Sequence, residues 1–424
     1  YATANSTGLQ AVKNWLAAVT SDASTLTNAT STTTLDSLLS TVKNNVASTG
    51  STFMLTKGLD NYQGTAGNDT IIGDNNTASA ADQINGGAGT DTLKLYNSSG
   101  NPVLPTISGI ENIYIKSSTA DYDVSTISGL TSLEIDTVNV NGAARAYTLA
   151  SGQSLTLTNV TDSAGSNDDV DVNAAASVTG QTIKLNGVGD TAAAGNDVEI
   201  DINGAGVATL DVVAQAASKV TLVNTGTALK TVNVSGDKDL TIAGVANATT
   251  IAITNTAKTA VTTAVDKVAV TGAAGAETVT LSHTSGTARE FSVSTGAGDD
   301  KIDLGALVLA ADLTDDKVTV TGGDGTDTLA MKSAMGAALS GLSAANYAKK
   351  GIANTFEVLE ITDQAAADAA GVQLIDLNAG LAHEAAVDAD LAEFVFDHGD
   401  LHAVRFAEHT LEQRGLARTE EAGE

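Results

Sequence analysis

The sequence predicts a mostly β protein: a parallel β-solenoid, or β-roll, with glycine-rich turns, preceded by a small α-helical N-terminal segment. Three observations predict it. From about residue 53, apolar and polar residues alternate over short stretches, the pattern of a strand with one buried face. Gly, Asn, Asp and Thr separate these stretches, and the chain has only two Pro. Helical periodicity is confined to the two ends of the chain.

Residues 1–52 are expected to be helical. Apolar residues recur at helical spacing over residues 9–19 and again over 35–46. Between these stretches, Ser21–Thr34 is rich in Ser, Thr and Asn, and is expected to be the turn joining two helices. The amphipathic pair needs a partner for its apolar faces. It either caps the solenoid or ends an anchoring domain that binds a partner.

The middle of the chain is expected to consist of short strands that start about 10–12 residues apart in their most regular part. Such regularity is typical of a sandwich array or a parallel solenoid. The connections are too short for Greek-key crossovers, so we favour the solenoid. The expected strands are Ile113–Ile115, Leu133–Ile135, Leu155–Leu157, Ile183–Leu185, Val198–Ile202, Leu210–Val213, Val220–Val223, Val232–Val234, Leu240–Ile242 and Ile251–Ile253.

Composition excludes several classes of protein. A hydrophobic fraction of 42% is too high for a disordered chain, and a net charge of −29 argues against nucleic-acid or anionic-membrane binding. The absence of Cys excludes thiol catalysis, disulfides and Cys-ligated metals. No apolar run reaches the roughly 18–20 residues of a transmembrane segment. Because the chain begins at Tyr1, we expect a fragment or a processed product.

The informative motif is the nonapeptide G-G-x-G-x-D-x-U-x, where U is a large apolar residue. Gly86–Lys94 and Gly322–Ala330 match it at every defined position, and Gly64–Ile72 and Thr295–Asp303 each lack one glycine. The glycines permit a tight turn with positive φ that directs carbonyls at one point, and the Asp adds a carboxylate. Ligation by oxygen alone is typical of Ca²⁺ rather than of zinc or copper. A single such loop would be an ordinary turn, but two complete copies with phased neighbours favour calcium.

The candidate metal ligands and their turn glycines follow from these copies. They are Asp60, Gly64, Gly67, Asp69, Asp82, Gly86, Gly87, Gly89, Asp91, Gly296, Gly298, Asp300, Gly322, Gly323, Gly325 and Asp327. A fifth copy, Gly272–Thr280, is degenerate, with Glu277 in place of Asp and Ala in place of the second glycine. We expect Glu277 to contribute little, because its longer side chain displaces the carboxylate.

The spacing of the first four Asp residues predicts how they pair. Asp60, Asp69, Asp82 and Asp91 are separated by 9, 13 and 9 residues. If two nonapeptides make one coil, Asp60 and Asp82 line one edge of the roll, and Asp69 and Asp91 line the other. Adjacent coils lie about 4.8 Å apart, so that successive loops can hold one ion between them.

These residues resemble the RTX repeats of bacterial proteins exported by type I secretion. The stretch from Phe53 to Ile113, with FMLTKGLD, GTAGND, GGAGTDTL and ISGIENI, is more similar still to RTX-type S-layer proteins. The resemblance covers about residues 51–335. It implies RTX calcium-binding turns with Ca²⁺ as the cofactor, secretion to the bacterial cell surface, and self-association into a lattice. It also implies a helical N-terminal region that binds cell-surface polysaccharide or lipopolysaccharide.

An internal repeat extends the pattern towards the C-terminus. Gly86–Leu93 matches Gly322–Leu329, and the related segments Gly109–Ile115 and Phe356–Ile361 follow them. A further strand follows each (Leu133–Ile135; Leu374–Leu377), so the natural chain is expected to continue as an array. The expected segments are 1–52 (helical cap or anchor), 53–94 (RTX roll), 95–270 (Thr/Ala/Val-rich solenoid), 271–335 (second RTX region), 336–380 (start of a further module) and 381–424 (atypical tail).

The tail carries His383, His398, His402 and His409 and is expected to be helical around Leu401–Leu416. The sequence after His383 lacks the second His of H-E-x-x-H, which removes the zinc-protease reading. The other three histidines form either a metal site or a polar helix face.

Three functions remain open. The first is a structural S-layer protein that depends on Ca²⁺. The second is an RTX adhesin or surface-binding, ice-binding-like solenoid, which flat rows of outward Thr would favour. The third is the non-catalytic RTX portion of a type I-secreted hydrolase. No catalytic motif is present, so we do not expect an enzyme.

Overall fold

The computed structural model describes residues 6–45, 50–140, 144–162, 170–189, 198–224, 227–245, 247–282, 290–304, 317–332, 335, 351–352, 355–363, 373–375, 382–386 and 394–395. The chain forms two compact units. The first comprises residues 1–118 and 126–136, and the second comprises residues 119–125 and 137–424.

The N-terminal segment holds three helices rather than the two that were predicted: α1 (Ser6–Ala17), α2 (Ala23–Ala29) and α3 (Thr32–Asn45). The prediction of a plain turn over Ser21–Thr34 was therefore wrong. The reason is local, because the Asp22 carboxylate accepts the Ser24 N–H at 2.8 Å and caps α2.

Apolar side chains of these helices remain on the surface. Leu16 is 63% exposed and Leu26 is 53% exposed. The Trp15 indole donates a hydrogen bond to the Ala29 carbonyl at 3.0 Å, which ties α1 to the end of α2. No helix in the described part of the chain is long and apolar enough to cross a membrane.

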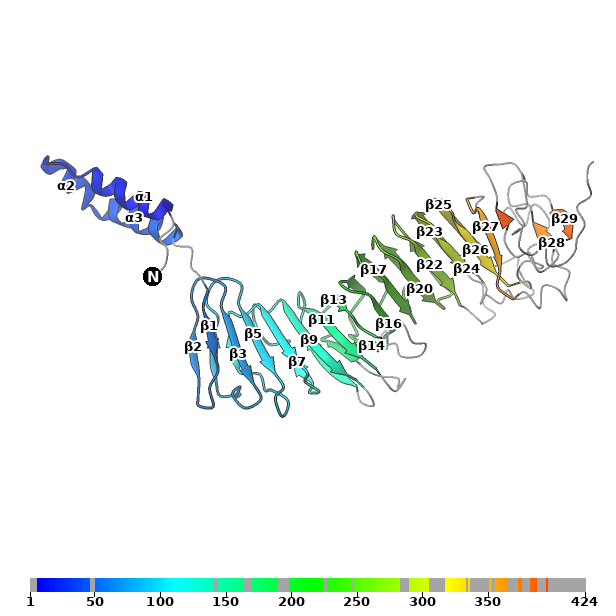
Figure 1. The fold of residues 1–424 in the computed structure, drawn as a ribbon, viewed down its shortest axis with the longest axis horizontal. Coiled ribbons are helices and arrows are strands. Elements are labelled where there is room, and N and C mark those ends of the chain that lie inside the picture. The colour runs from blue at the N-terminus through cyan, green and yellow to red at the C-terminus, as the bar shows by residue number, and fades with distance from the viewer. Residues whose placement is uncertain are drawn as a thin grey trace, which may run out of the picture. The chain divides into compact units, whose positions relative to one another are not determined.

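The first unit is a stack of parallel strands in which the chain alternates between two sheets (Figure 1). All its strand pairs are parallel. One sheet contains β1 (Thr52–Met54), β3 (Thr70–Asp74), β5 (Thr92–Tyr96), β7 (Asn112–Lys116) and β9 (Ser132–Asn139), and the other contains β2 (Asn61–Gln63), β4 (Gln83–Asn85) and β6 (Thr106–Ser108).

The core of this unit is a ladder of apolar side chains. Ile71, Leu93, Ile113 and Leu133 are in register on successive coils, and each is at most 1% exposed. Because alternate residues of a strand point to opposite faces, the apolar positions enter the core and the polar positions face outward. Burying each side chain stabilises the fold by about 1.5–3 kcal/mol.

The second unit has the same kind of architecture, with two sheets of parallel strands. One contains β8 (Tyr122–Asp123), β10 (Arg145–Leu149), β12 (Val170–Ala174), β14 (Val198–Asn203), β16 (Ser218–Asn224), β18 (Leu240–Ala243), β20 (Thr259–Thr263), β22 (Glu277–Leu281), β24 (Lys301–Asp303), β26 (Thr328–Met331) and β27 (Val358–Ile361). The other contains β11 (Ser154–Thr161), β13 (Gly180–Asn186), β15 (Thr209–Ala214), β17 (Thr231–Gly236), β19 (Thr250–Ile253), β21 (Lys267–Thr271), β23 (Glu290–Ala297) and β25 (Lys317–Asp324). The prediction of a parallel β-solenoid is confirmed.

The parallel stack ends near β27. This strand pairs in parallel with β26 and antiparallel with the short β30 (Phe394–Val395), while β28 (Gln373–Ile375) and β29 (Ala382–Ala386) form an antiparallel pair. His383 lies on β29. The other three tail histidines and the expected helix over Leu401–Leu416 lie outside the described residues.

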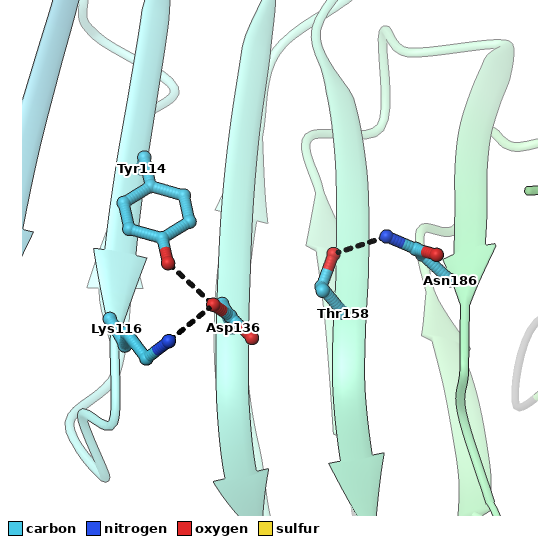
Figure 2. A network of polar contacts seen from close by, with 5 residues as sticks. All are labelled: Tyr114, Lys116, Asp136, Thr158 and Asn186. Carbon is cyan, nitrogen blue, oxygen red and sulfur yellow. Dashed lines mark hydrogen bonds and ion pairs between the residues drawn. The ribbon is translucent and has the colours of Figure 1, made fainter. Parts of the chain in front are cut away.

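Outward polar side chains link neighbouring coils (Figure 2). On β7 the Tyr114 hydroxyl donates to the Asp136 carboxylate of β9, and Lys116 Nζ lies 3.2 Å from Asp136 Oδ2. Burial and the adjacent Asp136 raise the pKa of Tyr114, which therefore stays protonated as a donor. Such contacts add lateral ties to the sheet hydrogen bonds.

Candidate metal centre

The predicted aspartates stand immediately before strands, where two coils meet. Asp60 and Asp82 pair at one edge, because the Asp60 N–H donates to Asp82 Oδ1 at 3.0 Å. Their remaining carboxylate oxygens also have partners: Thr56 N–H donates to Asp60 at 2.7 Å, and Ser79 N–H donates to Asp82 at 2.8 Å. Hydrogen bonds from the protein itself therefore satisfy both carboxylates of this pair.

A second column stands at the other edge of the first unit. The Asp69 N–H donates to Asp91 Oδ1 at 2.7 Å, and the Asp91 N–H donates to Glu111 Oε2 at 2.7 Å. Sequence spacing predicted the pairing of Asp69 with Asp91 but missed Glu111. Glu111 lies on the next coil and is the last acidic residue of this column, where its carboxylate accepts the Asp91 N–H.

The two aspartates of this column differ electrostatically. Burial opposes the ionisation of Asp69, but hydrogen bonds from Ser51 and Thr65 lower its pKa. Burial raises the pKa of Asp91, which also faces the like charges of Asp69 and Glu111. Asp91 is 0% exposed and its Oδ2 atom has no hydrogen-bond partner. Asp91 therefore has an oxygen available for a ligand.

Glycines bring main-chain carbonyls up to these carboxylates. A β-carbon on Gly64 would collide with the Gly86 carbonyl and would lie 2.7 Å from Asp69 Oδ2. One on Gly86 would collide with the Gly109 carbonyl and lie 2.5 Å from Asp91 Oδ2. Gly87 and Gly89 have φ of 102° and 124°, and the Gly67 carbonyl lies 2.8 Å from the place of a Gly89 β-carbon. Only glycine fits this spacing without strain.

The second unit contains a longer acidic column of four residues. The Glu277 N–H donates to Asp300 Oδ1 at 2.7 Å, the Asp300 N–H donates to Asp327 Oδ1 at 3.0 Å, and the Asp327 N–H donates to Glu357 Oε2 at 2.7 Å. Glu277, Asp300 and Asp327 are 1%, 2% and 0% exposed. Glu357 repeats the role of Glu111, which matches the internal sequence repeat.

Four buried oxygens of this column have no hydrogen-bond partner: both carboxylate oxygens of Glu277, Asp300 Oδ2 and Asp327 Oδ2. Burial and the adjacent Asp300 raise the pKa of Glu277 to about 8. Burial, together with the like charges of Asp300 and Glu357, raises the pKa of Asp327 to about 6. Among the described residues, no Lys or Arg forms an ion pair with the column. The column thus concentrates negative charge without a protein counter-charge.

The predicted glycines of this region surround the same carboxylates. Gly296 and Gly323 are in register on adjacent coils, and the Gly296 carbonyl occupies the place of a Gly323 β-carbon. In the same way, the Gly298 carbonyl occupies the place of a Gly325 β-carbon, and the Asp327 carboxylate occupies the place of a Gly322 β-carbon. This leaves carbonyl oxygens beside the buried acids.

The donor set suits a hard cation. Within the described ranges, no three His, Asp or Glu side chains gather in a metal cluster, so any ligand set combines one or two carboxylates with main-chain carbonyls. Ca²⁺ takes six to eight oxygen ligands of this mixed kind in flexible geometry. The unpartnered oxygens of Asp91, Asp300 and Asp327 therefore fit the calcium expectation better than the satisfied Asp60–Asp82 pair does.

Sequence reasoning missed Glu111 and Glu357 as members of the columns. The repeat of Gly109–Ile115 in Phe356–Ile361 carried the signal, because each segment is the next related segment after a complete nonapeptide copy, with its Glu 20 or 30 residues after the Asp of that copy. The comparisons with known proteins add no family. No family model matches this chain, and no curated protein is significantly similar to it in sequence.

Proposed function

We propose that this protein is a secreted, calcium-dependent structural protein of a bacterial cell surface that self-associates into an S-layer lattice. One observation carries the calcium part. Buried carboxylate oxygens without partners stand in register on successive coils, beside glycine carbonyls. An uncompensated buried charge is costly, and a cation between coils would offset that cost.

A calcium-dependent fold also suits export. Ca²⁺ binding at sites that exist only in the folded state stabilises that state by mass action. The chain would remain unfolded where Ca²⁺ is scarce, and would fold outside the cell. Type I secretion is part of this proposal through the RTX resemblance alone.

The outward residue rows favour a structural role over an adhesin of ice-binding type. The longest Thr rows in the described sheets have three members. One is Thr52, Thr70 and Thr92, followed in register by Asn112, and the other is Thr209, Thr231 and Thr250, followed by Ala269. Elsewhere a row mixes residue types, as in Ile72, Lys94, Tyr114 and Glu134. A uniform flat Thr face of the kind that the adhesin reading needs is therefore absent from the described strands.

Self-association is the proposed assembly step, and a second copy of this chain is the proposed partner. A net charge of −29 keeps copies apart at low ionic strength, and bound divalent cations reduce that repulsion. Exposed Leu16 and Leu26 on the N-terminal helices offer apolar surface for an anchor to cell-surface polysaccharide or lipopolysaccharide. An RTX adhesin or surface-binding solenoid and the non-catalytic RTX portion of a secreted hydrolase stay the alternatives.

Electron microscopy of the purified protein with and without millimolar Ca²⁺ tests the proposal. Ordered sheets that appear only with Ca²⁺ would support it. A chain whose thermal unfolding is identical in Ca²⁺ and EGTA would refute the calcium-dependent fold. Calcium-dependent folding without any assembly would point to the adhesin or hydrolase-appendage alternatives.

A further inference from the structure

The strongest unexplained group in the molecule is Glu277, which no complete nonapeptide copy includes. The sequence led us to expect little from it. In the structure it lies in register between Thr259 of the preceding coil and the Asp300 coil. It is 1% exposed, and neither carboxylate oxygen has a hydrogen-bond partner. A buried carboxylate with two free oxygens needs a partner that the chain does not supply.

One oxygen of Glu277 belongs to a set of three that surrounds a single point. The position of a β-carbon on Gly275 lies 2.7 Å from the Ala257 carbonyl, 2.8 Å from the Asn255 carbonyl and 2.8 Å from Glu277 Oε1. That point lies at bonding distance from the Gly275 Cα and cannot itself hold an ion, but it shows that the three oxygens gather where Gly275 has no side chain to separate them. A cation bound to all three, at calcium–oxygen distances of about 2.3–2.6 Å, would lie on the side of this point away from the Gly275 Cα.

The Asn255 side chain adds a second free oxygen near this loop. Asn255 is 0% exposed, and its Nδ2 donates to the Lys238 carbonyl at 2.9 Å and to Thr259 Oγ1 at 2.8 Å. These bonds use the amide donors and leave Oδ1 without a partner. The other Glu277 oxygen, Oε2, faces the next coil, 2.9 Å from the place of a Gly272 β-carbon, where the Thr295 carbonyl also lies.

We propose that Glu277 holds a divalent cation of the calcium type between its own coil and the preceding one, with the carbonyls of Asn255 and Ala257 as further ligands. This site lies one coil before the aspartate sites and outside the nonapeptide consensus. It rests on the proposed function in that both need calcium in the same column. The longer glutamate side chain reaches back towards the preceding coil, whose loop carries Thr259 instead of an acid.

Calcium stoichiometry and affinity, measured by isothermal titration calorimetry on the full chain, test the site. Glu277→Gln keeps the shape and removes the charge, and Glu277→Asp keeps the charge and withdraws the carboxylate by one methylene. We expect Glu277→Gln to bind one Ca²⁺ ion fewer per chain. We expect Glu277→Asp to keep the ion with an affinity at least about tenfold weaker. Glu290→Gln is the matched control, because Glu290 is exposed and pairs with Lys317 at the surface.

Thermal unfolding in EGTA and in Ca²⁺ gives a second readout that a merely structural role would not produce. Glu277→Gln should unfold at a higher temperature than wild type in EGTA, since it replaces a carboxyl whose ionised form is disfavoured by burial beside Asp300 with a neutral amide, and should gain less on adding Ca²⁺. An equal shift under both conditions would overturn the proposal. So would unchanged stoichiometry in both Glu277 variants while wild type binds calcium, an outcome that leaves the proposed function intact. No calcium binding by wild type would overturn both.

Discussion

At the scale of single residues, the distinguishing feature is a set of buried carboxylates that hydrogen bonding leaves half satisfied. Asp327 accepts the Asp300 N–H through Oδ1 and leaves Oδ2 free, and Asp91 does the same with Asp69. Asp82, by contrast, uses both oxygens within the protein. All three residues are aspartates that precede a strand, so we expect the free oxygens, rather than the residue type, to distinguish those that bind an ion.

Asp327→Asn tests this distinction. We expect the Ca²⁺ concentration needed to stabilise the fold to rise about tenfold or more, because a charged ligand is lost from a buried site. The measurement is the unfolding temperature across a calcium titration. Asp324→Asn is the control, since Asp324 lies in the same loop but is exposed. Identical titrations for the two variants would contradict the assignment of Asp327.

The pH dependence of the calcium-free protein follows from the raised pKa values. Burial raises the pKa of Glu277 to about 8 and that of Asp327 to about 6, above the ordinary values of 4.5 and 3.8. As pH rises, these carboxyls ionise first in the unfolded chain, so folding stability falls. The stability that these protonated carboxyls contribute is complete below their ordinary pKa values. It is lost as the pH rises through about 6 for Asp327 and about 8 for Glu277.

In EGTA, we therefore expect the second unit to unfold at a higher temperature at about pH 5 than at about pH 8. In the first unit, hydrogen bonds lower the pKa of Asp69 against the effect of burial, so ionised Asp69 stabilises the fold. That stabilisation is lost only when the pH falls near and below the ordinary pKa of 3.8, so it does not affect the comparison of pH 5 with pH 8. Calorimetry at the two pH values measures the effect. Saturating Ca²⁺ should reverse the trend, because the cation requires ionised ligands. Greater stability at pH 8 in EGTA would disprove this account of the column.

At the scale of elements, the coils depend on close approach between stacked glycine loops. Gly323 has φ of 131°, and the Gly296 carbonyl of the adjacent coil fills the place of its β-carbon. Gly152 also has positive φ, at 83°, but nothing lies within 4 Å of its missing β-carbon. A residue with a β-carbon would have an unfavourable backbone conformation at both positions, but its β-carbon would clash with a neighbouring coil only at Gly323.

Gly152→Ala should therefore cost about 1–2 kcal/mol of folding stability, the cost of a left-handed backbone for an L-residue. Gly323→Ala should cost clearly more, because the methyl group must also displace the Gly296 carbonyl of the preceding coil. Chemical denaturation of both variants in saturating Ca²⁺ gives the comparison. Equal losses would mean that crowding between the loops contributes nothing.

At the scale of the whole molecule, we expect charge and calcium together to govern association. A net charge of −29 repels copies from one another, and bound divalent cations would weaken that repulsion and order the loops. We expect a soluble protein at low Ca²⁺ and ordered self-association at millimolar Ca²⁺. Mg²⁺ should substitute poorly, because it retains its waters and demands a tighter octahedron.

Light scattering across matched Ca²⁺ and Mg²⁺ series checks this expectation. Because both ions screen charge equally at the same concentration, the Mg²⁺ series is the control for screening alone. Equal association in the two series would indicate simple screening rather than a specific calcium site. Absence of association in both would remove the lattice from the proposed function.

The sequence by itself determined the strands and the turn chemistry. Alternation of apolar and polar residues is a local property, so Ile113–Ile115 and Ile183–Leu185 could be assigned as strands without a structure. Glycines at fixed positions before an Asp likewise specify a local turn. The Asp22 cap was also local, but its short helix was hidden in a stretch with the composition of a turn.

Only the tertiary structure decided which coil stacks on which. The contacts of Glu277 with Asp300 and of Asp327 with Glu357 join residues 23 and 30 positions apart. Coil lengths vary, and a shift of one residue would turn every side chain to the opposite face. Register is therefore fixed by packing of the whole ladder rather than by any local pattern. For that reason Glu277, which the motif discounts, lies in the same buried column as the aspartates.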